Sequence, residues 1–166
     1  MLMITPNELP FQAKKKEAET KKLFNKIKKN RPNDLDATVH EIHEEVFSRM
    51  DCLTCANCCK TTSPIFKIRD IERLAKYLKL KPNDFIAKYL HIDEDHDYVL
   101  NSAPCAFISG DNTCLVYDNR PDACREYPHT DRRKFHQLLE LTLKNTFICP
   151  ATYEIVERLK KSLDGH

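Results

Sequence analysis

The sequence contains very little glycine. Only two of its 166 residues are glycine, Gly110 and Gly165. Nucleotide-binding folds place several glycines where the backbone must come close to a phosphate group. The sequence therefore excludes a protein that holds a nucleotide in a glycine-rich loop.

Long hydrophobic runs and a strong excess of one charge are also missing. No stretch approaches the roughly 18 apolar residues that would span a bilayer. The N-terminal apolar stretch is short, and Pro6 and Pro10 interrupt the segment after it, so we expect no secretory signal. These features predict a cytoplasmic protein with no membrane partner, in a compartment where thiols stay reduced. The formal net charge of +2 argues against a dedicated nucleic-acid-binding protein.

Helical periodicity dominates the rest of the chain. Asp34 is a candidate N-cap, and apolar residues then recur at three- and four-residue spacing, which predicts a helix over 35–50. Similar patterns predict helices over 69–79, 84–90, 131–144 and 151–163, the last with Pro150 in its first turn. Residues 91–130 lack a long period and predict loops with a small strand at 98–100. The expected fold is mostly α, a small helical domain with cysteine-bearing loops between its helices and little or no β structure.

The first 33 residues differ in composition from the rest. Eight lysines and only two glutamates lie between residues 11 and 30. We therefore predict a basic N-terminal helical arm over 1–33 and a separate cysteine-cluster domain over 34–166. The arm could contact RNA or another acidic partner, or it could be a solvated helix packed along one edge. Phe11, Leu23, Phe24 and Ile27 would form that edge.

Cysteine is abundant, with eight residues in two groups. The first group is Cys52-x2-Cys55-x2-Cys58-Cys59, and a C-x2-C step brings two thiolates to one metal ion. Four unbound thiols so close together would oxidise easily. Metal binding is therefore the interpretation that this group favours. We predict that the domain over 34–166 is a metal-binding domain whose cysteine-bearing loops are folded around a metal centre.

The second group lies in loop-like sequence and is spread along the chain. A ligand of this kind closes a long loop, which is costly unless a metal holds it. Each of these cysteines could instead be a small buried apolar residue. The predicted ligands are all eight cysteines: Cys52, Cys55, Cys58, Cys59, Cys105, Cys114, Cys124 and Cys149.

The spacing leaves zinc, iron and an iron–sulfur cluster open. The C-x2-C-x2-C start and the Cys149-Pro150 pair occur in bacterial ferredoxins, but there the fourth cysteine follows after three residues. Zinc also accepts four cysteines at such spacings. Lys60, Arg120 and Arg125 are close in sequence to these cysteines and could offset the negative charge of a thiolate site.

Two histidine-containing segments are weaker candidates for metal binding. His40-Glu41-Ile42-His43 has one residue too few between Glu and the second His for a zinc-protease helix, so it is more simply a polar helix flank. His129 could place an imidazole near the metal, or it could precede a helix capped by Thr130 or Asp131. No catalytic residue can be assigned from the sequence.

The order of cysteines carries a resemblance to a known family. Cys52-x2-Cys55-x2-Cys58-Cys59, Pro104-Cys105 and Tyr117-x2-Arg120-Pro121-x2-Cys124-Arg125 resemble the CxxCxxCC (YkgJ-type) family. This resemblance covers about residues 50–150 and implies a zinc- or iron-chelating domain. A similar cluster occurs in flagellin lysine methylases, and eight cysteines exceed the four of one closed site. The alternative is therefore an iron–sulfur or metal-dependent oxidoreductase, or a methyltransferase-like enzyme, acting on a protein or RNA.

Overall fold

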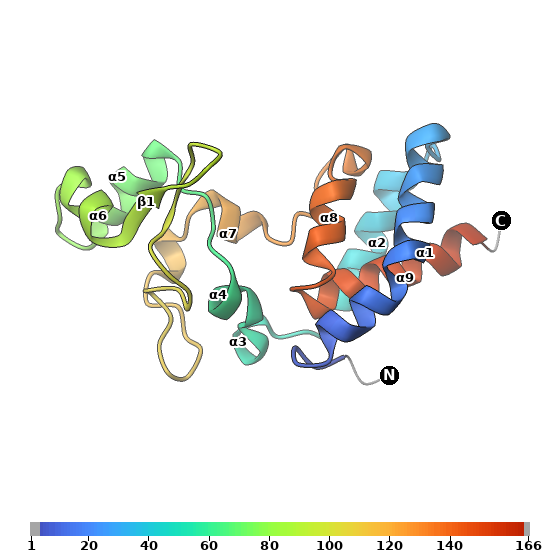
Figure 1. Cartoon of the computed structure of the whole chain (residues 1–166), viewed down its shortest axis with the longest axis horizontal. Coiled ribbons are helices and arrows are strands. Elements are labelled where there is room, and N and C mark those ends of the chain that lie inside the picture. The colour runs from blue at the N-terminus through green and yellow to red at the C-terminus, as the bar shows by residue number, and fades with distance from the viewer. Residues whose placement is uncertain (1–3, 165–166) are drawn as a thin grey trace. The chain divides into compact units, whose positions relative to one another are not determined.

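A computed structural model describes residues 4–164 (Figure 1). The described residues form two compact units, one from residues 4–51 and 128–164 and the other from residues 52–127. We call them the helical unit and the cysteine unit. The predicted fold class is confirmed, since helices dominate and the strands of the described residues form one two-stranded sheet. None of the helices within 4–164 combines the length and the apolar character needed to cross a bilayer.

The helical unit is built from four main helices that pack on one another (Figure 1). They are α1 (Leu9–Lys29), α2 (Leu35–Phe47), α8 (Leu139–Asn145) and α9 (Pro150–Asp164), and the short 3-10 helix η2 (Phe135–Gln137) precedes α8. Helix α9 contacts the other three helices, because its apolar positions recur every three or four residues. Its fully buried side chains include Ile155, Val156 and Leu159.

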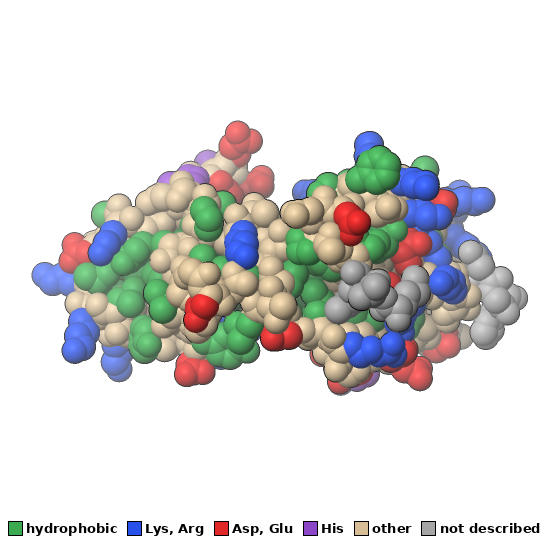
Figure 2. All heavy atoms as spheres, turned by 90° about the horizontal axis from the view of Figure 1, so that it is seen from below, with side chains coloured by type: hydrophobic (Ala, Val, Ile, Leu, Met, Phe, Trp, Pro, Cys, Tyr) green, Lys and Arg blue, Asp and Glu red, His purple; other side chains and the backbone are tan. Residues whose placement is uncertain are grey.

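Helix α1 is a packed element of this unit. Six of its residues are buried, namely Leu9, Ala13, Thr20, Leu23, Phe24 and Ile27. The apolar edge predicted from the sequence is therefore present except at Phe11, which is 71% exposed. On the face of the helical unit drawn in Figure 2, both Lys or Arg and Asp or Glu side chains are exposed. The predicted boundary at residue 33 stays a prediction, because packing alone does not define a domain.

The cysteine unit has its own hydrophobic core. It contains the helices α3 (Cys52–Cys55), α4 (Asn57–Thr61), α5 (Ile68–Tyr77), α6 (Pro82–Tyr89) and α7 (Asp122–Glu126), the 3-10 helix η1 (Tyr117–Asn119) and strands β1 (Leu90–Ile92) and β2 (Tyr98–Leu100). The strands are antiparallel, with Leu90 opposite Leu100. Phe85 is fully buried at the centre and packs against Phe66, Tyr89 and Phe107. Cys105 and Cys114 pack against this core, which places their thiols at its edge.

Local patterns predicted most helices but missed several short elements. The helices expected at 35–50, 69–79, 84–90 and 151–163 correspond to α2, α5, α6 and α9, and the strand at 98–100 is β2. Strand β1 and helix α7 lie in segments too short for a periodic signal. The helix expected over 131–144 begins only at Leu139, because the chain takes left-handed backbone angles at His129 and Lys134 before η2.

Candidate metal centre

The first cysteine group forms two short helices joined by a single residue. Helix α3 ends at Cys55, and Ala56 takes a left-handed conformation (φ 47°) before α4 begins. Such a backbone costs a non-glycine residue about 1–2 kcal/mol. Within α4, the Sγ atoms of the adjacent residues Cys58 and Cys59 lie 4.0 Å apart.

Three cysteines that are distant from Cys59 in the sequence come close to it. The amide of Cys105 donates a hydrogen bond of 2.8 Å to the carbonyl oxygen of Cys59. Cys114 forms an isolated antiparallel bridge with Ile108, which keeps it beside the Cys105 turn. Cys124 lies in α7, the helix that follows Pro121. The thiols of Cys59, Cys105, Cys114 and Cys124 all interact electrostatically, and we call these four residues the thiol cluster.

The four thiols of the thiol cluster differ strongly in acidity. A hydrogen bond from Cys58 lowers the pKa of Cys59 to about 6, and the positive charges of Arg120 and Lys60 add to this effect. Burial, together with the neighbouring Cys59, Cys105 and Cys114, raises the pKa of Cys124 to about 12. Burial also raises the pKa of Cys105 and Cys114. One thiolate therefore shares the cluster with three neutral thiols at pH 7.

Arg120 is held rigidly beside the thiol cluster. Its guanidinium carbon lies 3.5 Å from the centroid of the Tyr117 ring, and its Nε donates to the Tyr117 carbonyl oxygen at 2.8 Å. The carbonyl oxygen of Arg120 accepts hydrogen bonds from Arg73 and Arg125. Arg125 therefore fixes the loop, whereas Arg120 supplies positive charge to the thiols.

A family model matches residues 51–146, more than half of the chain, and its description reads "Putative zinc- or iron-chelating domain". The chain belongs to the CxxCxxCC family. The matched range contains seven of the eight cysteines, all except Cys149. No curated protein and no solved structure matches the chain significantly. The family assignment therefore supports metal binding by this region.

The remaining predicted ligands have different surroundings. Cys52 is exposed, and Cys55 and Cys58 are half-buried. Cys149 belongs to the helical unit, where it is buried and its amide donates to the carbonyl oxygen of Asn145 at 2.8 Å. All eight cysteines lie within the described residues, and none of them forms a disulfide there. Whether Cys52, Cys55, Cys58 and Cys149 act as ligands stays a prediction.

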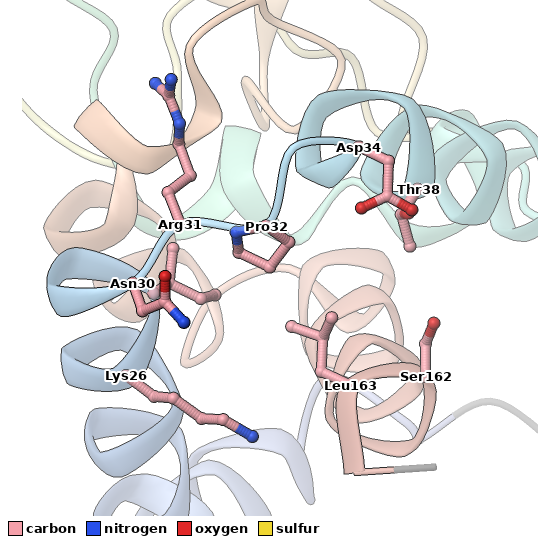
Figure 3. A pocket seen from close by; sticks show the side chains of 9 residues that line it. Lys26, Asn30, Arg31, Pro32, Asp34, Thr38, Ser162 and Leu163 are labelled. Carbon is pink, nitrogen blue, oxygen red and sulfur yellow. The ribbon is translucent and has the colours of Figure 1, made fainter. Parts of the chain in front are cut away.

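The helical unit holds two further features that contain no cysteine. A shallow cavity of about 340 Å³ is lined by residues of α1, α2, α9 and the 30–34 turn, among them Lys26, Asp34 and Ser162 (Figure 3). The second is a group formed by His40, Glu44 and Asp131, whose ligand atoms all lie within 4.8 Å of one another. In the sequence, this group is indicated only by the four-residue spacing of His40 and Glu44, which places both on one helix face. The sequence did not reveal the contribution of Asp131.

Proposed function

We propose that the chain binds zinc or iron through its cysteines, and that the thiol cluster provides the ligands of one centre. The observation that carries the proposal is the mutual electrostatic interaction of four thiols, two from the helices α4 and α7 and two from the loops that hold Cys105 and Cys114. Thiolates are ligands of both zinc and iron–sulfur clusters, so this set fits either metal. Cys52, Cys55 and Cys58 would extend this centre or form a second one.

The charges around the thiol cluster support this proposal. Four thiolates around a zinc dication carry a net charge of −2, and four around an oxidised four-iron cluster carry the same charge. Arg120 and Lys60 both act electrostatically on Cys59 and together supply two positive charges. These two positive charges would offset the −2 charge of the metal with its four thiolates. This lowers the free-energy cost of burying the centre partly.

Metal analysis of anaerobically purified protein tests the proposal. We expect zinc or iron in a fixed ratio to protein, with broad visible absorption for an iron–sulfur centre and none for zinc. Serine substitutions at Cys59, Cys105, Cys114 and Cys124 should each reduce the bound metal, while Ser102→Ala gives a control at an exposed position close to Cys105. Metal-free protein with eight titratable thiols would refute the proposal.

An enzymatic role is the second candidate. The eight cysteines exceed the four of a closed structural site, and a metal with an exchangeable position can act on a substrate. The alternative is an oxidoreductase or a methyltransferase-like enzyme that acts on a protein or RNA. If all eight serine variants lose the metal to the same extent, no spare ligand is left and this interpretation fails.

The partner of α1 and the cytoplasmic location also stay proposals. Several lysines of α1 already pair with carboxylates: Lys14 and Lys21 with Glu17, and Lys16 with Glu19. These pairs favour the solvated, packed helix over a surface for RNA or another acidic partner. Salt-sensitive RNA affinity that is lost on substituting Lys15, Lys22 and Lys29 would reverse this preference.

A further inference from the structure

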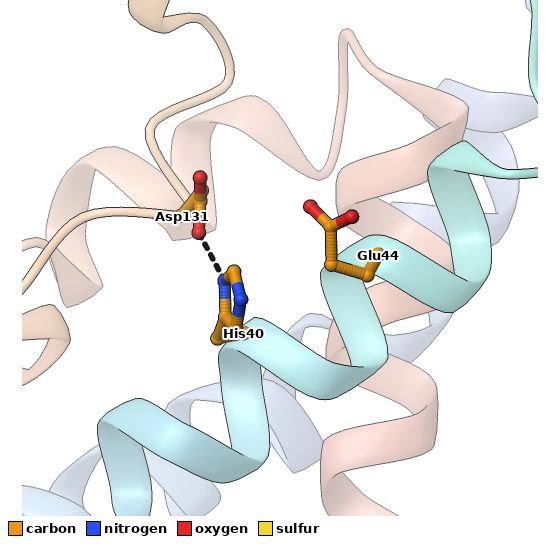
Figure 4. A group of neighbouring side chains, drawn as sticks. All are labelled: His40, Glu44 and Asp131. Carbon is orange, nitrogen blue, oxygen red and sulfur yellow. Dashed lines mark hydrogen bonds and ion pairs between the residues drawn. The ribbon is translucent and has the colours of Figure 1, made fainter.

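A second group of metal-ligating side chains lies in the helical unit. His40 and Glu44 are one turn apart on α2, and Asp131 reaches them from the segment that precedes η2 (Figure 4). His40 Nδ1 is hydrogen-bonded to an Asp131 carboxylate oxygen. The three ligand atoms all lie within 4.8 Å of one another, and all three residues are exposed.

The segment that carries Asp131 is held against α2 by several hydrogen bonds. The carboxylate of Asp36 accepts from the amides of Lys134 and Phe135 at 2.7 and 3.0 Å. His43 Nδ1 lies 2.8 Å from Thr130 Oγ1. Phe135 is fully buried beneath this segment. These contacts fix the position of Asp131 without involving its own side chain, so the group is preorganised.

We propose that His40, Glu44 and Asp131 form a second metal site, which binds a divalent first-row cation such as Zn²⁺. Imidazole nitrogen and carboxylate oxygen are both ligands of zinc, and two carboxylates with one neutral imidazole balance the charge of a dication. A bound cation replaces the hydrogen bond between His40 and Asp131. With three protein ligands and an exposed location, water completes the coordination and the metal exchanges with solution.

This site differs chemically from the thiol cluster and does not depend on it. Its donors are nitrogen and oxygen, and none of them belongs to the cysteine unit. A thiolate site holds zinc far more tightly than one imidazole and two exposed carboxylates. Zinc added to protein that already contains its cysteine-bound metal should therefore report on the second site alone.

Equilibrium dialysis of the metal-loaded protein against Zn²⁺ tests the proposal. We expect the wild-type protein to take up one additional equivalent, and Glu44→Gln and Asp131→Asn to weaken its affinity at least about tenfold. Glu41→Gln is the matched control, because it removes the same charge from an exposed position on α2 outside the group. This control should bind like the wild type, and all variants should retain their tightly bound metal.

Two results would overturn the proposal. One is a wild-type protein that binds no additional zinc, and the other is a set of variants that bind it as tightly as the wild type. Circular dichroism checks that the variants keep their helices, and His40→Gln replaces any variant that does not fold. Loss of the tightly bound metal in cysteine variants tests the thiol cluster separately, so each site can fail without the other.

Discussion

The unequal acidity of the thiol cluster predicts how steeply metal binding depends on pH. With a pKa of about 6, Cys59 is about nine-tenths thiolate at pH 7. Cys124, with a pKa of about 12, is protonated, as are Cys105 and Cys114, whose pKa values burial raises. A divalent metal that binds all four sulfurs therefore releases about three protons at pH 7 and about four at pH 5.

Proton linkage converts these numbers into an affinity change. The logarithm of the affinity rises with pH by the number of protons released, because only thiolates bind the metal. Zinc affinity should therefore fall about a thousandfold from pH 8 to pH 7, and more steeply once Cys59 also becomes protonated. Competition with a chromophoric chelator, corrected for protonation of the chelator, measures this slope.

Two cysteine variants make the prediction specific. Cys124→Ser removes a thiol that is protonated at pH 7, so the number of protons released should drop from about three to about two. Cys59→Ser removes a group that is already a thiolate, so about three protons should still be released. Calorimetry in buffers of different ionisation enthalpy counts these protons. A slope near one, or equal counts for the two variants, would refute the assignment of the four thiols to one centre.

Three further perturbations test the surroundings of the two sites. Phe85→Ala should lower the free energy of unfolding by about 3–5 kcal/mol in denaturant titrations, while Ile92→Ala at an exposed strand position should change it by less than about 1 kcal/mol. Arg120→Gln should raise the pKa of Cys59 and slow its alkylation at pH 7, and an unchanged rate would contradict the role given to Arg120. Asp36→Ala should speed hydrogen exchange at the amides of residues 134 and 135 about tenfold.

The contrast between Cys59 and Cys124 has a simple physical origin. Cys59 accepts a hydrogen bond from Cys58 and lies near Arg120 and Lys60, which all favour its charged form. Cys124 is more deeply buried and lies near the thiolate of Cys59, and both effects disfavour a second negative charge. Without a bound metal ion, the thiol cluster therefore carries a single negative charge, which limits electrostatic repulsion among its sulfur atoms.

Local sequence signals predicted the features that depend on neighbouring residues. Apolar spacing indicated α2, α5, α6 and α9, because a helix buries one face at a fixed period. The spacing of Cys52, Cys55, Cys58 and Cys59 and the Arg-Pro step before Cys124 indicated the family, which the match over residues 51–146 confirms. Short elements such as β1 were not predicted, because three residues are too few to show a periodic spacing of apolar side chains.

By itself the sequence determined a mostly helical, cysteine-rich member of a zinc- or iron-chelating family. Only the tertiary structure decided which distant side chains meet. It brought Cys105, Cys114 and Cys124 into electrostatic contact with Cys59, and Asp131 to the helix face of His40. It also assigned Cys149 to the helical unit. The spacing of apolar residues indicates which face of a helix is buried. Contacts between side chains that are distant in the sequence depend instead on the path of the loops between elements.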